Sequence, residues 1–433
     1  MAMHKRLLKG GRIVDPAHNL DQTGDLLLAD GKIARIGSEI TELEAELIDA
    51  SGLIVCPGLI DIHVHFREPG DENEETIATG SEAAVAGGFT SVACMPNTDP
   101  ALDDEASIEF VYRQASRANL CNVYPIGAIT EHREGRRLTE MGHMVRAGAV
   151  GFSDDGVGVA STSVMLRAMQ YIRMFDKPIL QHCEDSDIAA GGVMNGGSTA
   201  VRLGMPGISP IAEELMIQRD LTLVRETGAR YHVQHVSTAR SIELIRQAKA
   251  AGLPLTTEVC PHHLLLTEEA CANYDSNYKI NPPLRTQNDV EACRQGVLDG
   301  TIDCLVTDHA PHGLQEKELE FLEAPFGIIS LECAVPLYIK ALSAAGPLDW
   351  STLIEKLTCR PATVLSLTKG TLTCGADADV TLIDPELEWT VDVKEFKSKS
   401  RNCPYDGWKL KGRAVMTIVG GEIKYQLDTA IAQ

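Results

Sequence analysis

The chain has 433 residues, of which 44% are hydrophobic and 23% are charged. These proportions are typical of a folded globular protein that is long enough for one large domain and a smaller one. Lys and Arg number 39 against 61 Asp and Glu, which gives a net charge of −22. Such a charge repels phosphate backbones and anionic lipid headgroups, so we expect neither nucleic acid nor a membrane as a partner.

The start of the chain, MAMHKRLLKGGRIVD, contains basic residues but no apolar run of signal-peptide length behind them. No later stretch is apolar enough to span a bilayer, and we therefore expect a cytoplasmic protein. The 12 Cys include no C-x-x-C pair, and several lie within apolar, strand-like runs. We interpret them as reduced thiols.

From Leu7 to about Val55 the sequence predicts short strands and tight turns, with a hairpin signal at Asp30-Gly31. From about Cys56 to Lys369, eight β-rich runs alternate with helical stretches. These runs are residues 59–66, 90–96, 121–130, 149–155, 177–185, 229–237, 254–263 and 303–312. Eight nearly continuous apolar strands, each followed by a helix, predict a (β/α)8 TIM-like barrel, an α/β fold.

After Leu372 the β pattern returns, with ADVTLID at 378–384 and AVMTIVGGEIKY at 414–425. We expect the two chain ends to pair beside the barrel. The predicted division is a composite small β-sandwich domain from residues 1–55 and 372–433, and a barrel domain from residues 56–371.

Polar residues collect at the ends of the apolar runs, and in a barrel these ends converge on the face that carries catalytic groups. His63 and His65 are two residues apart on the first run, so both imidazoles point to the same side. A metal site is favoured by this spacing, and a hydrogen-bonded pair of core histidines is the alternative.

Four other apolar runs also end in or near polar residues. These are Asp154 and Asp155 on one run and His182, His235 and Asp308 on the others. Imidazole and carboxylate ligands without thiolate suit Zn²⁺ and related cations. Six ligands exceed the need of one tetrahedral zinc ion, so two ions bridged by one carboxylate are the economical arrangement. The alternative, six polar groups buried without a ligand, would cost several kcal/mol of desolvation.

The motif PGLIDIHVH at 57–65 resembles the opening signature of the amidohydrolase superfamily. The later motifs that narrow the resemblance are FREPG at 66–70, MPNT at 95–98, SDDG at 153–156, KINPPLR at 279–285, DHAPH at 308–312 and APFG at 324–327. With GADADV at 375–380 and LKG at 410–412, they resemble the dihydroorotase family, in its longer bacterial type with an aspartate bridge. The resemblance runs nearly from end to end.

This resemblance implies a hydrolase of pyrimidine biosynthesis that interconverts dihydroorotate and N-carbamoyl-aspartate with Zn²⁺, two ions per subunit. The implied metal ligands are His63 and His65 for the first ion, His182 and His235 for the second, Asp155 between them and Asp308 on the first. Asp154 should point the other way and bond to backbone, because neighbouring strand residues alternate. Asp308 is the implied catalytic acid and base, while the ions would activate water and polarise the ring carbonyl.

The substrate assignment depends on residues beyond the ligands. Arg67 lies two residues past His65 on the predicted rim, where a guanidinium can hold the dihydroorotate carboxylate through two charge-assisted hydrogen bonds. Other substrate-binding residues are expected to be His65, Asn97 and Asn281, and by resemblance His312 and the backbone of Phe326 and Gly327. A salt bridge from Arg67 to Glu68 or Asp71, and turn-capping by the two asparagines, are the alternatives.

His232 lies three residues before His235, which predicts that it faces away from the site. The charged stretch from Gln315 to Glu323 is interpreted as a solvated face, and the alternative is that residues 313–325 form a mobile flap.

The nearest rival functions are those of a hydantoinase, a dihydropyrimidinase or an allantoinase, and Arg67 argues against the first two. A non-catalytic scaffold is the rival of another class, against which six intact ligand positions argue. The resemblance also leaves open a homodimer and a complex with aspartate transcarbamoylase.

Overall fold

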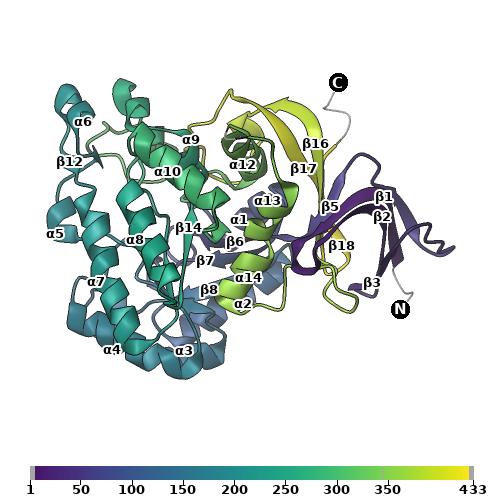
Figure 1. Ribbon diagram of the computed structural model, residues 1–433, viewed down its shortest axis with the longest axis horizontal. Helices are drawn as coiled ribbons and strands as arrows, with labels where there is room; N and C mark the ends of the chain where they lie inside the picture. Colours follow the sequence, from purple (N-terminus) through teal and green to yellow (C-terminus); the bar gives the residue numbers. More distant parts are fainter. Residues whose placement is uncertain (1–4, 345, 429–433) are drawn as a thin grey trace.

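The computed structural model describes residues 5–344 and 346–428. Residues 1–4 and 429–433 of the predicted terminal domain lie outside the described part. A barrel of alternating strands and helices occupies one side of the molecule, and a β domain built from both chain ends occupies the other (Figure 1). Among the described residues, no helix has the length and apolar character needed to cross a membrane.

The barrel consists of eight parallel strands, in the order β15-β14-β13-β10-β9-β8-β7-β6. Their bounds are β6 Leu59–Val64, β7 Phe89–Cys94, β8 Asn122–Gly127, β9 Gly151–Phe152, β10 Ile179–Gln181, β13 Tyr231–Val233, β14 Leu255–Val259 and β15 Cys304–Leu305. A parallel bridge between Val64 and His309 closes the ring, and the N–H of His65 donates to the carbonyl of His309 at 2.8 Å. The predicted barrel is confirmed.

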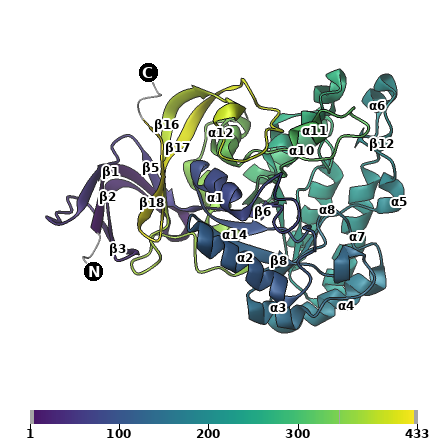
Figure 2. The same cartoon turned by 180° about the vertical axis from the view of Figure 1, so that it is seen from behind.

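Each barrel strand is followed by helical structure. The main helices are α1 Ile77–Ala86, α2 Glu105–Ala118, α3 Met141–Ala147, α4 Thr162–Ile172, α7 Ile211–Thr227, α8 Ala239–Ala250, α10 Gln287–Leu298 and α12 Ala334–Ser343. The remaining elements here are α5 Ser186–Ala189, β11 Met194–Asn195, α6 Ser198–Leu203, β12 Gly207–Ile208, α9 Pro261–Leu265, α11 Leu314–Lys317, α13 Trp350–Leu357 and α14 Cys359–Leu365. Figure 2 shows α5, α6 and α7 at the end remote from the β domain.

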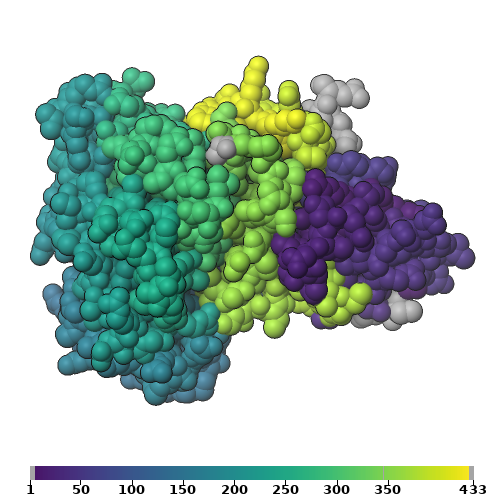
Figure 3. All heavy atoms as spheres, in the orientation of Figure 1, coloured from purple at the N-terminus to yellow at the C-terminus, as the bar shows by residue number. Residues whose placement is uncertain are grey.

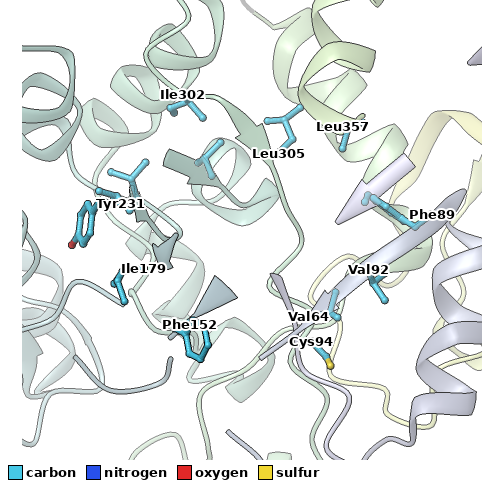
Figure 4. Packing of buried hydrophobic residues seen from close by; sticks show 14 of the residues in the cluster. Val64, Phe89, Val92, Cys94, Phe152, Ile179, Tyr231, Ile302, Leu305 and Leu357 are labelled. Carbon is cyan, nitrogen blue, oxygen red and sulfur yellow. The ribbon is translucent and has the colours of Figure 1, made fainter. Parts of the chain in front are cut away.

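The strands are apolar because both of their faces are covered. Every residue of β6 and β7 is buried, as parallel strands between helices require. Val64, Val92 and Cys94 lie close together on these two strands, and Phe152 and Ile179 continue the packing towards β10 (Figure 4). The core holds the carboxyl ends of the strands in fixed positions.

The chain ends form one eight-stranded sheet, ordered β18-β17-β16-β5-β1-β2-β3 with β4 paired to β1. Its strands are β1 Lys5–Asp15, β2 Leu20–Ala29, β3 Lys32–Gly37, β4 Glu46–Asp49, β5 Ile54–Pro57, β16 Val380–Thr390, β17 Lys409–Val419 and β18 Glu422–Gln426. The N-terminal residues therefore lie against the last strands (Figure 3). The predicted β-rich second part is confirmed, with all its strands hydrogen-bonded into a single sheet.

Candidate functional site

A cluster of histidines and aspartates lies where the carboxyl ends of the barrel strands meet. Asp155, just past β9, is at its centre: its Oδ1 lies 3.5 Å from Nε2 of His63, 3.4 Å from Nε2 of His235 and 3.8 Å from Nδ1 of His182. Three strand ends thus supply histidines to a carboxylate that follows a fourth strand.

The other carboxylate of the cluster comes from Asp308, just past β15. Its Oδ1 lies 2.9 Å from Nε2 of His65 and 3.5 Å from Nε2 of His63. Oδ2 of Asp155 lies 3.5 Å from the same Nε2 of His65. All six predicted metal ligands therefore share one small, buried space.

The cluster has the donor set that a metal centre needs. Nε2 of His63 and Oδ1 of Asp155 are buried and have no hydrogen-bond partner in the described structure, although unpartnered buried polar atoms are costly. Two overlapping groups bring potential ligand atoms within 4.8 Å of one another: His63, Asp155 and His235, and His63, His65 and Asp308. These residues fit metal ions held by imidazole and carboxylate.

The charges within the cluster support the same interpretation. Burial would raise the pKa of Asp155 and of Asp308, but the surrounding histidines, His63 first among them, hold both pKa values below their ordinary range. The two carboxylates are therefore ionised and ready to bind a cation.

Glu258 on β14 belongs to the site and was missed from the sequence. It is fully buried, and its carboxylate contacts Nδ1 of His63 at 2.5 Å and Nε2 of His232 at 2.9 Å. Burial raises its pKa, but His63 and His232 lower it to about 2. A charged residue inside an apolar strand was the available signal, and its contact fixes the ring of His63 with Nε2 towards Asp155.

The prediction that His232 faces away from the site is wrong, because Glu258 links it to His63. The prediction assumed that side chains alternate along the strand as far as His235. The strand β13 ends at Val233, however, and His235 has a left-handed backbone with a φ of 29°, so the alternation does not reach it. Asp154, in contrast, accepts hydrogen bonds from the N–H groups of Ile129 and Thr130, as expected for the residue that points away.

A cavity of about 390 Å³ opens above the cluster and is lined by most of the predicted substrate-binding residues. Arg67 is 8% exposed, and its Nε donates to the carbonyl of Pro311 at 3.0 Å. It pairs with Glu74 at 3.1 Å rather than with Glu68 or Asp71, and its Nη2 lies 3.2 Å from Nε2 of His312. Arg67 and His312 thus form one polar wall.

The two predicted asparagines contact the histidines of the cluster. Oδ1 of Asn97 lies 2.7 Å from Nδ1 of His65, and Nδ2 of Asn281 lies 3.4 Å from Nε2 of His182. Both asparagines line the cavity, and Oδ1 of Asn281 is buried without a partner in the described structure. They orient the imidazoles and retain capacity for a ligand.

Phe326 and Gly327 are positioned differently from each other. Phe326 lines the cavity, and its carbonyl is 2.8 Å from Nε2 of His312. Gly327 is not part of the lining, and its N–H donates to the carbonyl of Lys279 at 2.9 Å. The structure therefore brings Phe326 to the cavity and leaves Gly327 just behind it.

Arg133 also lines the cavity and was missed from the sequence. It ends a 3-10 turn, Glu131–Arg133, after β8, and its Nη2 donates to the carbonyl of Asp155 at 3.0 Å. No strand periodicity predicts the direction of a side chain in such a turn.

Several site residues occupy the left-handed backbone region, where side chains other than glycine are strained. Their φ values are 59° for Arg67, 58° for Arg133, 29° for His235 and 47° for Asp308. Such strain persists where the surrounding structure enforces it, and it is typical of functional sites.

Cys260, His262 and His263 form a second buried group of potential ligand residues, outside the cavity lining. The rings of His262 and His263 lie 4.4 Å apart, and Nε2 of His263 contacts the carbonyl of Pro282 at 3.0 Å. Burial lowers the pKa of both rings. They are neutral packing residues in this structure.

Comparison with known proteins is consistent with this geometry. A family model described as dihydro-orotase-like matches residues 52–241. A dihydroorotase from Pelotomaculum thermopropionicum is 52% identical to this chain, and the alignment covers 98% of this chain and 99% of the relative. A dihydroorotase from Syntrophotalea carbinolica is 50% identical, and that alignment covers 98% of this chain and 100% of the relative.

Among solved structures, an L-hydantoinase (dihydropyrimidinase) from Arthrobacter aurescens has a TM-score of 0.87 with 28% identity and covers 99% of this chain and 98% of its own. A dihydropyrimidinase from Brevibacillus agri has a TM-score of 0.84 with 21% identity over 98% and 95%, a likeness of fold alone. The barrel, the cluster and the near-complete alignment lead to one conclusion. The chain belongs to the dihydroorotase family of amidohydrolases.

Proposed function

We propose that this chain catalyses the reversible hydrolysis of (S)-dihydroorotate to N-carbamoyl-L-aspartate, a step of de novo pyrimidine biosynthesis. One observation carries the proposal: the same cavity holds the ionised Asp308 within the metal-binding cluster and the buried guanidinium of Arg67. A cyclic amide with a carboxylate on its ring needs both groups, one at the bond that is cleaved and one at the carboxylate.

The proposed metal ligands are those predicted from the sequence. His63 and His65 would hold one Zn²⁺ and His182 and His235 the other, with Asp155 between the ions and Asp308 on the first. Zinc suits this set of imidazole and carboxylate donors. When bound, the ions would lower the pKa of a water molecule and polarise the ring carbonyl.

The chain's own residues would then bind the substrate and move the proton. Asp308 accepts a proton from the attacking water and delivers it to the ring nitrogen as the amide bond breaks, with the roles reversed for ring closure. Its Oδ1 is held 2.9 Å from Nε2 of His65, which fixes the carboxylate at the reacting centre.

The proposed substrate contacts surround this centre. Arg67 binds the ring carboxylate through its guanidinium, with Asn97, Asn281 and His312 beside it. His65 completes the reaction side, and the backbone of Phe326 and Gly327 faces the ring amides. The N–H of Gly327 donates to the carbonyl of Lys279. The backbone around Gly327 would have to shift locally for this N–H to donate to the substrate instead.

At larger scale, we propose a cytoplasmic enzyme whose residues 1–55 and 372–433 form one domain and residues 56–371 the catalytic barrel. A homodimer and a complex with aspartate transcarbamoylase are part of the proposal. Size-exclusion chromatography with light scattering, alone and with the transcarbamoylase, tests both.

The decisive experiment compares substrates. Purified protein loaded with Zn²⁺ should hydrolyse dihydroorotate, followed by ultraviolet absorbance, with a kcat/KM at least about 100-fold above those for hydantoin, dihydrouracil and allantoin, because only dihydroorotate engages Arg67. Preference for a neutral ring would replace the proposal with a hydantoinase or allantoinase activity. Absence of turnover on all four rings would favour a scaffold protein.

A further inference from the structure

Arg133 has an unusual environment for a guanidinium. Burial lowers its pKa, and the nearest opposing charges are those of Asp155 and Asp154. Within residues 5–344 and 346–428, however, no carboxylate forms an ion pair with it, and the one hydrogen bond that it donates goes to the carbonyl of Asp155. Its Nε is buried and has no hydrogen-bond partner among the described residues.

Arg67, the other guanidinium of the cavity, is already paired with a carboxylate, that of Glu74. Arg133 is half-buried, and partial burial of a cation without an ion-pair partner is costly. It lines the cavity from a turn with two successive residues in the left-handed region, His132 and itself. The guanidinium of Arg133 is therefore available to an anionic ligand in the cavity.

The two guanidiniums approach the cavity from different parts of the rim. Arg67 follows β6 and contacts the loop after β15, whereas Arg133 follows β8 and contacts the end of β9. Asp155 and Asp308 of the metal-binding cluster line the cavity as well. Gly156 also lines the cavity beside Arg133, and a Cβ added there would make an ordinary van der Waals contact with Nη2, at 3.4 Å.

The two forms of the proposed substrate differ by one carboxylate. Dihydroorotate carries a single carboxylate, whereas N-carbamoyl-L-aspartate carries a second one that ring opening creates and ring closure consumes. We propose that Arg133 binds this second carboxylate and so selects the open-chain acid, a role that rests on the proposed dihydroorotase function.

The proposal predicts a specific division of kinetic effects for Arg133→Met. KM for N-carbamoyl-L-aspartate should rise about 10-fold or more with little change in kcat, because a charge-assisted hydrogen bond present in both bound acid and transition state is lost. The equilibrium constant is fixed, so kcat/KM must fall by the same factor in both directions. In hydrolysis the loss should appear in kcat, with KM for dihydroorotate nearly unchanged.

Controls separate this role from a structural one. Arg133→Lys keeps the charge and should recover part of the lost affinity, while Arg136→Met, an exposed arginine three residues on, should leave both directions unchanged. Metal content, measured by mass spectrometry, and thermal unfolding should match the unaltered protein.

The outcomes distinguish the hypotheses. An equal rise of KM for both substrates would overturn the proposal, because Arg133 would then not distinguish open chain from ring. Loss of metal would also overturn it, because Arg133 would then act through Asp155. An unaltered protein without dihydroorotase activity would refute the proposed function itself, before any variant is compared.

Discussion

The carboxylate of Asp308 contacts both His63 and His65, so it can hold metal, move a proton, or do both. Asp308→Asn keeps the size of the side chain and removes its basicity. We expect kcat to fall by about 100-fold or more, as for other positioned acid-base groups, while most of the metal remains. Steady-state kinetics and metal analysis on the same sample check this, and an unchanged kcat would reduce Asp308 to a ligand.

Arg67 is the residue on which ring specificity depends. Arg67→Met should weaken binding of dihydroorotate by about 2–4 kcal/mol, since charge-assisted hydrogen bonds to its carboxylate are lost, with little effect on a neutral ring such as dihydrouracil. The measurement is KM for both rings. Because the change also strips Glu74 of its ion pair, the double variant with Glu74→Gln serves as control.

At the residue scale, the sequence predicted the side chains that follow regular strands. His63, His65 and Asp308 lie where strand ends place them. Glu258 was missed because a single glutamate within an apolar run gives no spacing to interpret. Arg133 was missed because its direction depends on left-handed backbone at two positions of a turn, which tertiary contacts enforce.

At the scale of elements, β9 and the residues after it, Gly151 to Asp155, contain no lysine. The bridge between the proposed ions is therefore a carboxylate that the chain already carries, and no CO₂ is needed to make a carbamate. Metal-free protein reconstituted with Zn²⁺ in CO₂-free buffer should regain the same activity as with bicarbonate. Recovery that depends on bicarbonate would place the bridge on a modified lysine instead.

The segment from Gly313 to Pro325, next to the cavity, is anchored by a buried lysine. Nζ of Lys317 donates to the carbonyls of Pro325 and Gly327 at 2.9 and 3.1 Å. Burial, helped by the charge of Lys279, lowers its pKa to about 7. The segment predicted to be a solvated face thus contains two buried residues, Lys317 and Phe321.

This lysine should make stability depend on pH. The pKa of Lys317 is about 7 in the folded chain, whereas a lysine in the unfolded chain keeps its proton up to roughly pH 10. Between pH 7 and pH 10 the unfolded state therefore binds more protons than the folded state. The free energy of unfolding rises with pH over this range. The free energy of unfolding of the unaltered protein should therefore increase relative to that of Lys317→Met as the pH is raised from 7 to 10. Urea unfolding at each pH measures it, and exposed Lys394→Met should show no such trend.

The barrel strands were predictable because burial on both faces makes a strand apolar throughout, as in β6 and β7. The order of strands in the terminal domain could not be predicted, because a pairing such as that of Val380 with Pro57 depends on contacts between segments that are distant in the sequence. Sequence pattern identifies the strands, and the folded chain decides their neighbours.

For the whole molecule, metal removal should affect activity and stability together, because ligands from β6, β9, β10, β13 and β15 converge on one centre. A strong chelator should abolish turnover and lower the Tm, and Zn²⁺ should restore both. Calorimetry beside the activity assay checks this. Full activity in verified metal-free protein would contradict the mechanism.

The sheet that joins both chain ends also determines the order of events during synthesis. β5 pairs with β1 on one side and with β16 on the other, so the edge of β5 stays open until the ribosome has released residues beyond the barrel. An open strand edge can pair with the same edge of another nascent chain. β5 is therefore the last of the N-terminal strands to reach its final neighbour, and a messenger truncated after the barrel would yield a chain that exposes this edge permanently.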